Sequence, residues 1–456
     1  MVSSSSSTTT SSILTYDFCD ADALPAELTP LSSLEYNQFY KLCPGLQQHP
    51  NGTILPLGQP RCGDDSNYSF FLTRPAAAAT AESVNEKIVI ELSGGGACWD
   101  SITCALQSSQ LAFPTLLNSF VGSSCASISS LDILCSKTIA DIDLSEYSYL
   151  FIPYCTQDIH LGDAISTDYG VQHVGGHNLY RTLSWVFENY PNPQHVIVTG
   201  CSAGATPLPV VYDLINRHYQ KVAASSTSSS SNATTTTTTT TTTNKKSESG
   251  GDGGGSGIDD GVVIIDVIAD SSVFLTPEPF LDKYISNWNL GTIMDMIDFD
   301  FDTYKNQTNF SVAILDHVLD RSKSTDDVAY TFHDADQISQ YYYKMMNGSS
   351  LSELFDDGDG GGRKLLSMSS SSSLTEGRYL PIMHHQKSTP ATTTLHRGLN
   401  EDVFQSQWLA ELNNTISLAG VGHSNFHVYF MNGTGHCNYG LVREKVLHAH
   451  LSDILL

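Results

Sequence analysis

One short segment, residues 196–204, constrains the fold of this chain more than any other. A run of β-branched residues (VIVT) leads directly into the pattern Gly-x-Ser-x-Gly, whose serine is Ser202. β-Branched residues favour strands. A strand that ends in this pattern is typical of a nucleophile elbow, a sharp turn that presents one serine hydroxyl. An ordinary turn is the alternative, and the strand before the motif argues against it.

A second glycine-rich segment also follows a strand pattern. Residues 87–92 (KIVIEL) predict a strand that runs into residues 93–97 (SGGGA). Consecutive glycines leave backbone N–H groups accessible where side chains would block them, although a flexible turn would have the same composition. Such a loop forms part of the oxyanion hole in α/β-hydrolases. Together with the elbow, it predicts that the N–H groups of Gly96, Ala97 and Ala203 stabilise an oxyanion.

Strand and helix patterns alternate along the chain. Further strands are predicted at 150–154, 261–269, 328–332 and 427–431, and helices at 177–190, 208–219, 309–322 and from about 441. This alternation predicts an α/β fold of α/β-hydrolase type, with a mostly parallel central sheet flanked by helices. Prolines at 207 and 209 predict that the helix after the elbow restarts near Thr206 instead of continuing from Ser202.

Composition divides the chain into one catalytic domain with insertions. Residues 1–30 are rich in Ser and Thr and then acidic, and we expect them to be unstructured. Residues 31–456 are predicted to form a single domain. Low-complexity loops are predicted within it at about 223–257, which includes a threonine run, and at about 356–376.

A serine hydroxyl becomes a nucleophile only beside a base that is oriented by an acid. In α/β-hydrolases these groups follow the chain order Ser, acid, His. Ser202, Asp336 and His436 satisfy this order, and each follows a predicted strand. Asp334 remains an alternative acid. This chemistry requires no cofactor and no metal ion, and the cysteines show no CxxC pairing typical of zinc sites.

Loops at the carboxyl ends of strands line the ligand site in open α/β sheets. Asp158 and His160 follow the strand at 150–154 and are candidate substrate contacts, although a structural role is equally open. Asp270 follows the strand at 261–269 and is expected to line the pocket or cap a helix. Trp99, just after the glycine loop, is a further candidate substrate contact.

Charge restricts the classes of partner. The chain has 22 Lys and Arg residues against 48 Asp and Glu residues, a formal net charge of -26. Such a surface repels nucleic acids and anionic lipids. It favours a neutral or esterified glycan over a free polyuronate. No run of about 18 apolar residues occurs, so no transmembrane helix is expected. We also expect the protein to be a monomer.

Ten cysteines and repeated Asn-x-Ser/Thr sequons favour an extracellular, disulfide-bonded glycoprotein. A chain rich in Ser and Thr also generates sequons by chance, and residues 1–12 show no apolar signal sequence. Proximity alone suggests the disulfides Cys98–Cys104 and Cys125–Cys135. Cys201, which precedes the nucleophile, is expected to be a buried free thiol.

Three segments together resemble the pectin acetylesterase / Notum family of carboxylesterases: residues 92–98 (LSGGGAC), 200–204 (GCSAG) and 435–437 (GHC). Residues 335–338 (ADQI) resemble the acid motif of that family. The resemblance implies Ser202 as nucleophile, with the acid at position 336, the base at position 436 and the same oxyanion donors. The chain departs from the family pattern at Ser93 and Ala97, where family members often carry Glu and an aromatic residue.

Plant members of this family remove acetyl groups from pectin, and Notum removes a fatty acyl group from a signalling protein. The resemblance therefore implies a serine carboxylesterase that removes O-acetyl groups from an extracellular polysaccharide. A lipid deacylase of Notum type is one alternative. A glycan-binding relative without catalytic activity is another, and it belongs to a different functional class.

Overall fold

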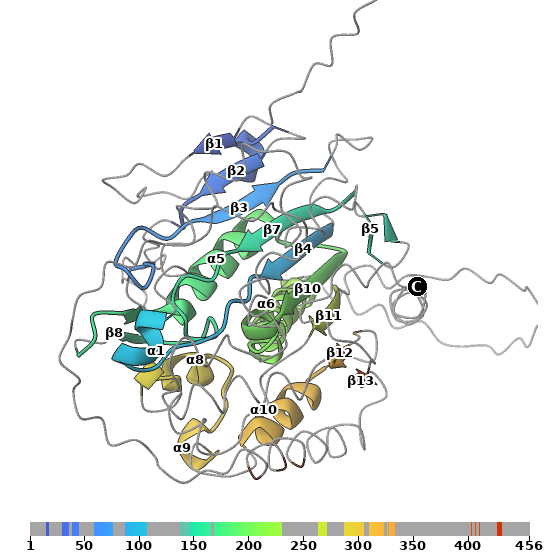
Figure 1. The fold of residues 1–456 in the computed structure, drawn as a ribbon. Helices are drawn as coiled ribbons and strands as arrows, with labels where there is room; N and C mark the ends of the chain where they lie inside the picture. The colour runs from blue at the N-terminus through green and yellow to red at the C-terminus, as the bar shows by residue number, and fades with distance from the viewer. Residues whose placement is uncertain are drawn as a thin grey trace, which may run out of the picture.

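A nine-stranded sheet forms the centre of the described structure, with the strand order β1-β2-β3-β7-β4-β10-β11-β12-β13 (Figure 1). The computed structural model describes residues 15–17, 30–35, 39–44, 59–75, 87–106, 138–139, 142–143, 146–165, 168–229, 263–270, 287–304, 310–322, 326, 328–332, 403, 406, 410 and 426–430. The strands are β1 (Thr15–Asp17), β2 (Phe39–Leu42), β3 (Phe70–Thr73), β7 (Ser148–Ile152), β4 (Lys87–Leu92), β10 (His195–Cys201), β11 (Ile264–Asp270), β12 (Val328–Phe332) and β13 (Phe426–Phe430).

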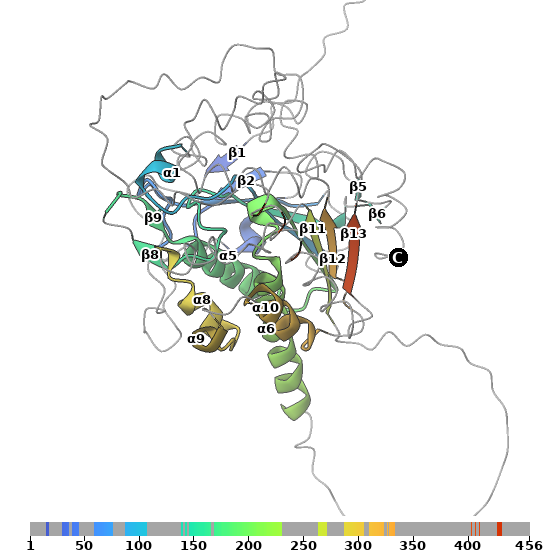
Figure 2. The same cartoon turned by 60° about the horizontal axis from the view of Figure 1, so that its bottom comes forward.

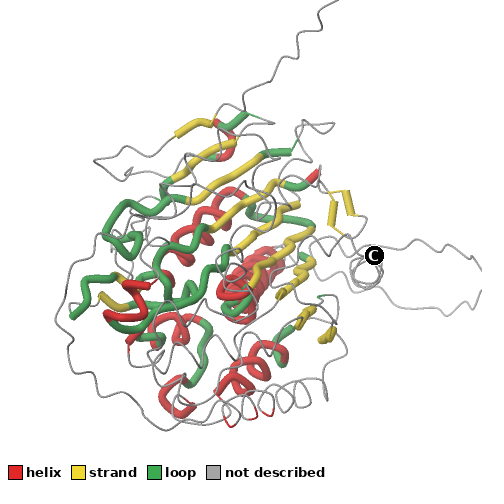
Figure 3. Tube along the Cα trace, viewed as in Figure 1, coloured by secondary structure: helices red, strands yellow, loops and turns green. Residues whose placement is uncertain are grey.

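The sheet is mostly parallel, as predicted. β3 runs antiparallel to both of its neighbours, β2 and β7, and the other six pairs are parallel. Two small antiparallel pairs lie outside it: β5 (Thr138–Ile139) with β6 (Ile142–Asp143), and β8 (Ala164–Ile165) with β9 (Gln172–His173). Figure 3 shows the row of central strands in yellow with helices beside it.

The helices in the described residues are α1 (Ser101–Leu106), α5 (Gly175–Asn189), α6 (Leu208–Ser229), α8 (Gly291–Met296), α9 (Phe301–Tyr304) and α10 (Phe310–Leu319), with 3-10 turns η1 (Leu31–Ser33) and η5 (Ser202–Gly204). Helices α5, α6 and α10 lie on the same side of the sheet (Figure 2). Trp185 of α5 packs on Phe70 of β3, with ring centroids 5.3 Å apart. Helix α6 contacts β10 and β11, and α10 contacts α6. The predicted α/β fold of α/β-hydrolase type is therefore confirmed.

Burial explains why the strand before the elbow is apolar throughout. In β10, which lies between β4 and β11, every residue after the first is buried. A strand covered on both faces carries a continuous apolar run instead of an alternating one. The VIVT run therefore encodes a central position in the sheet.

Two elements extend beyond the predicted patterns. Helix α6 continues to Ser229, so it enters the segment expected to be a low-complexity loop. Thr15–Asp17, inside the segment expected to be unstructured, forms β1 and pairs with β2. The 356–376 insertion and the helix predicted from about residue 441 lie outside the described residues. Within the described part of the chain, no helix has both the length and the apolar character needed to cross a bilayer.

The disulfides agree in part with the sequence prediction. Cys98–Cys104 is present as predicted, and a further disulfide, Cys62–Cys155, joins residues 93 positions apart that no local pattern relates. Cys125 and Cys135 lie outside the described residues. The prediction that Cys201 is a free thiol is wrong, because Cys201 is disulfide-bonded.

Candidate active site

Ser202 stands in a strained turn at the carboxyl end of β10. Its φ is 56°, in the left-handed region that non-glycine residues rarely adopt. The turn η5 begins at this residue, and Thr206 donates hydrogen bonds from its backbone N and its Oγ1 to the Ser202 carbonyl, at 3.1 and 3.0 Å. Helix α6 then starts separately at Leu208, which confirms the predicted break after the elbow. This backbone is that of a nucleophile elbow.

Close backbone approaches explain two glycines at this turn. A Cβ atom built on Gly204 would lie 2.1 Å from the carbonyl oxygen of Leu92 at the end of β4. A Cβ on Gly94 would lie 2.3 Å from the carbonyl oxygen of Cys201 and 3.3 Å from Cβ of Ser202. The elbow and the glycine loop therefore touch through their backbones, and any side chain at these positions would force them apart.

The glycine loop presents backbone N–H groups beside the elbow. Gly95 and Gly96 have φ values of 156° and 76°. Among the described residues, no acceptor is recorded for the N–H of Gly96 or of Ala97. Ser202 itself is 8% exposed, whereas Ala97 and Ala203 are fully buried. Free N–H groups near a nucleophile in a site of low solvent exposure are what an oxyanion hole requires.

The other two members of the predicted triad lie outside the described residues, as does the alternative acid Asp334. The strands that precede Asp336 and His436 are described, and β12 and β13 have the predicted positions within one residue. Both run parallel to β10 through β11, so their carboxyl ends lie at the edge of the sheet that carries Ser202. That His436 lies within hydrogen-bond reach of Ser202 remains a prediction.

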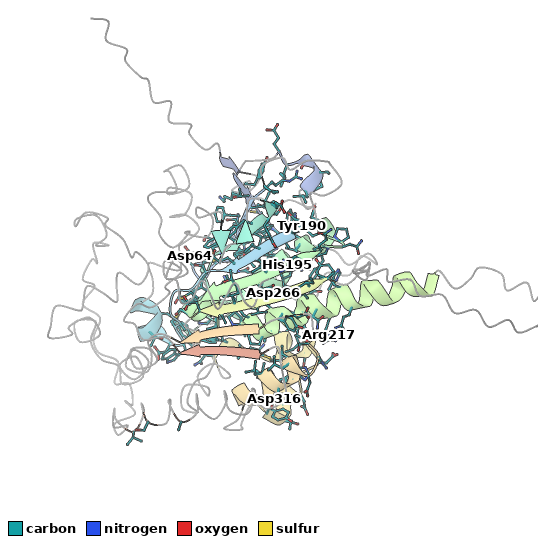
Figure 4. All side chains as sticks on the ribbon, turned by 90° about the vertical axis from the view of Figure 1, so that its right-hand side faces the viewer. Asp64, Tyr190, His195, Arg217, Asp266 and Asp316 are labelled. Carbon is teal, nitrogen blue, oxygen red and sulfur yellow. A yellow bond between two sulfur atoms is a disulfide. The ribbon has the colours of Figure 1, made fainter. Side chains whose placement is uncertain are left out.

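Another histidine–aspartate pair lies at the opposite end of β10. His195 Nε2 is 2.8 Å from Asp266 Oδ2, and the Tyr147 hydroxyl is 2.8 Å from His195 Nδ1. Figure 4 labels His195 and Asp266 on the sheet. A seven-residue strand separates His195 from Ser202 by roughly 20 Å. This pair therefore cannot supply the base for Ser202.

The residues predicted to contact substrate lie within the protein interior or beside the elbow. Asp158 is fully buried, and its carboxylate accepts hydrogen bonds from Thr156 Oγ1 at 2.6 Å and from the N–H of Gly175 at 2.7 Å. Trp99 is 3% exposed within the main hydrophobic core. Asp270 ends β11 and pairs in register with Cys201, so it adjoins the elbow. Their roles in substrate binding remain predictions.

His160 contacts the glycine loop directly. It is 1% exposed, and its Nε2 lies 2.8 Å from the carbonyl oxygen of Ser93. Burial lowers the pKa of His160 to about 4, and the hydrogen bond to Ser93 and the negative charge of Asp158 oppose this shift only in part. The ring is therefore neutral at neutral pH. Because Nε2 faces a carbonyl oxygen, Nε2 carries the proton and donates it.

The lowered pKa of His160 predicts a loss of stability in weak acid. Between about pH 6.5 and pH 4 the unfolded chain binds a proton on this residue that the folded chain does not. The free energy of unfolding should then fall by up to about 1.4 kcal/mol for each pH unit of acidification, from this residue alone. Urea unfolding from pH 7 to 4.5 measures this slope. In His160→Gln the number of protons bound on unfolding, which this slope reports, should decrease by about one. An unchanged slope would contradict a lowered pKa of His160.

One cluster in the described part of the chain has the composition of a metal site. Cys98, Cys104 and His173 place their ligand atoms within 4.8 Å of one another. Metals bind the thiolate form of cysteine, and here both sulfur atoms form a disulfide. These three residues therefore cannot coordinate a metal while the disulfide is intact.

Long-range contacts that the sequence did not indicate fix the end of the glycine loop. Trp288 Nε1 donates a hydrogen bond of 2.8 Å to the carbonyl oxygen of Cys98. The N–H of Cys98 donates to the carbonyl oxygen of Gln157 at 3.0 Å. No motif surrounds Trp288, and only its tertiary position reveals its role.

The parallel sheet, the strained serine and the adjoining glycine loop define the α/β-hydrolase class of protein. Comparison with known proteins narrows this class. Residues 57–244 match the pectinacetylesterase family, and this region contains Ser202 and the glycine loop but neither Asp336 nor His436. The predicted resemblance to the pectin acetylesterase / Notum family is thus confirmed for this region of the chain.

A curated relative supports the same family. The chain is 26% identical over 203 residues to the palmitoleoyl-protein carboxylesterase NOTUM of Schmidtea mediterranea. This match covers 43% of the present chain and 34% of the relative. The match thus spans about a third of the length of that protein.

Proposed function

We propose that this chain is a serine carboxylesterase that removes O-acetyl groups from an extracellular polysaccharide. The observation that carries the proposal is the left-handed backbone of Ser202, directly beside the glycine loop at the carboxyl end of the central strand. A strained non-glycine residue persists only where the surrounding structure holds it, and such residues cluster at functional sites. The match to the pectinacetylesterase family supports the reaction class.

The proposed reaction proceeds through an acyl-enzyme. His436, oriented by Asp336, accepts the proton of the Ser202 hydroxyl as the oxygen attacks the ester carbonyl. The N–H groups of Ala203 and of the glycine loop at positions 96 and 97 stabilise the oxyanion, and the loss of one such donor typically costs about 3 kcal/mol. The alcohol leaves with a proton from His436. Water then attacks the acyl group with His436 again as base, and acetate is released.

Charge and disulfides support the proposed substrate and location. The net charge of -26 disfavours a free polyuronate and favours an esterified or neutral glycan. The disulfides Cys62–Cys155 and Cys98–Cys104 fit an oxidising, extracellular compartment. The proposed enzyme acts as a monomer and needs no cofactor.

A lipid deacylase is the second candidate, because the curated relative is a palmitoleoyl-protein carboxylesterase. The two candidates differ in the acyl group that they prefer. We expect kcat/KM for p-nitrophenyl acetate to exceed that for p-nitrophenyl octanoate by at least about tenfold, since an acetyl-specific site has no room for the extra methylenes of an octanoyl group. A preference for octanoate would favour the deacylase.

The natural substrate class is tested with pectin. Acetate release should occur from acetylated pectin and should cease when the pectin has been saponified beforehand. Binding of pectin without release of acetate, together with no turnover of either p-nitrophenyl ester, would support the glycan-binding alternative instead.

A further inference from the structure

The loop after β7 contains an unusual concentration of strained backbone. Gln157, Ile159 and His160 have φ values of 57°, 52° and 60°. A left-handed conformation costs a non-glycine residue about 1–2 kcal/mol, and for the β-branched Ile159 it is a true outlier. All three residues are buried. Strain of this kind persists only when many contacts determine it.

Buried polar contacts hold this loop in place. The Asp158 carboxylate accepts hydrogen bonds from Thr156 Oγ1 and from the N–H of Gly175, the first residue of α5. The N–H of Ile159 donates to the Tyr154 hydroxyl at 2.7 Å. The loop is therefore anchored to a helix N-terminus on one side and to an aromatic side chain on the other.

From this rigid base, the last residue of β7 and the segment that follows it contact both ends of the glycine loop. At the first end, the N–H of Ser93 donates to the carbonyl oxygen of Ile152 at 3.0 Å, and His160 Nε2 donates to the carbonyl oxygen of Ser93 at 2.8 Å. At the other end, the N–H of Cys98 donates to the carbonyl oxygen of Gln157 at 3.0 Å. The residues between these ends include the candidate oxyanion donors.

One of these contacts depends on a side chain. The His160 ring lies against the Tyr154 ring, with centroids 4.7 Å apart, and this contact directs Nε2 toward Ser93. Ser93 is joined directly to Gly94, which lies against the elbow. Rotation of the Ser93 peptide would therefore move the backbone that leads to the oxyanion donors.

We propose that His160 is a positioning residue that fixes the Ser93 peptide and thereby orients the N–H groups of Gly96 and Ala97 toward the developing oxyanion. This proposal rests on the proposed esterase function. His160 does not touch the reacting atoms. Its effect is to preorganise the donors, which matters because misplaced donors stabilise the transition state poorly.

Three variants of His160 test its role with p-nitrophenyl acetate. His160→Phe keeps a ring against Tyr154 but removes the donor, and we expect kcat to fall about 10- to 100-fold with KM within twofold. His160→Gln retains an N–H donor at similar reach and should recover most of the loss. His160→Asn tolerates left-handed backbone but is too short to reach Ser93, so it should behave as the Phe variant does.

The control variant is His317→Phe. His317 Nε2 also bonds a carbonyl oxygen, that of Ile297 at 2.8 Å, but on α10. Removing this bond should change kcat less than twofold. A trifluoromethyl ketone, which forms an oxyanion when Ser202 adds to it, supplies a further measurement. Its affinity should fall in proportion to kcat in the His160 variants, an effect that general loss of stability does not produce.

The outcomes separate this proposal from the proposed function. Absence of Ser202-dependent turnover in the wild type would overturn both. Wild-type turnover with an unchanged kcat in folded His160→Phe or His160→Asn would overturn the positioning role alone. The same follows if the Gln variant is as impaired as the Phe variant, or if the loss falls on KM while affinity for the ketone is unchanged.

Discussion

Replacing Ser202 with alanine is expected to reduce kcat for p-nitrophenyl acetate by at least about 10⁴-fold while the protein remains folded. The substitution removes only the hydroxyl that attacks the ester. Alanine has the same steric cost as serine at a φ of 56°, so the elbow should keep its shape. Steady-state turnover and the midpoint of thermal unfolding, measured on the same preparations, check both parts of this expectation.

Two variants control for effects on folding. Ser202→Gly also lacks the hydroxyl, but glycine relaxes the left-handed backbone, so this variant should be inactive without being less stable than Ser202→Ala. Ser33→Ala removes an exposed serine of η1, whose hydroxyl bonds only locally to Pro30, and should retain full activity. If Ser202→Ala retained more than about a tenth of wild-type turnover, another residue would be the nucleophile.

The second large effect is expected from Gly204→Ala, which should lower the free energy of unfolding by about 3 kcal/mol or more. The new methyl group would lie 2.1 Å from the carbonyl oxygen of Leu92 and 2.8 Å from two backbone carbon atoms. Backbone at the end of a central strand cannot move aside as a flexible side chain can. Urea denaturation measures the change, and activity should fall as the elbow shifts.

Alanine substitutions at two other glycines serve as controls, because they change the freedom of the backbone without the steric clash expected at Gly204. Gly291 is the first residue of α8, and in Gly291→Ala the new methyl group would lie 3.5 Å from the Phe301 ring, an ordinary contact. This substitution should raise the free energy of unfolding by about 0.5 kcal/mol. Gly170 has a φ of 71° with open space around it, so Gly170→Ala should cost only about 1 kcal/mol of backbone strain. If Gly204→Ala cost no more than Gly170→Ala, close approach would not explain this glycine.

Local patterns located the elements of the site but not their supports. The strand and elbow at 195–204, the glycine loop and the strand at 328–332 follow from propensity and from the position of glycine, both of which act over a few residues. For His160 the sequence indicates either a substrate contact or a structural role, and it does not indicate which residue His160 contacts. Its contact with Ser93, 67 positions away, depends on the pairing of β4 with β7. Spacing in the sequence carries no such information.

The amino-acid sequence by itself determined an α/β sheet with a serine turn after its central strand. Buried parallel strands and tight turns each need particular residue types within a short span of sequence. Only the tertiary structure decided how the turn is held. The bond between Cys62 and Cys155 and the contact of Trp288 with the glycine loop join segments that are distant along the chain. Such contacts form because the folded sheet brings these segments together, and burial then favours hydrogen bonds between the polar groups that meet there.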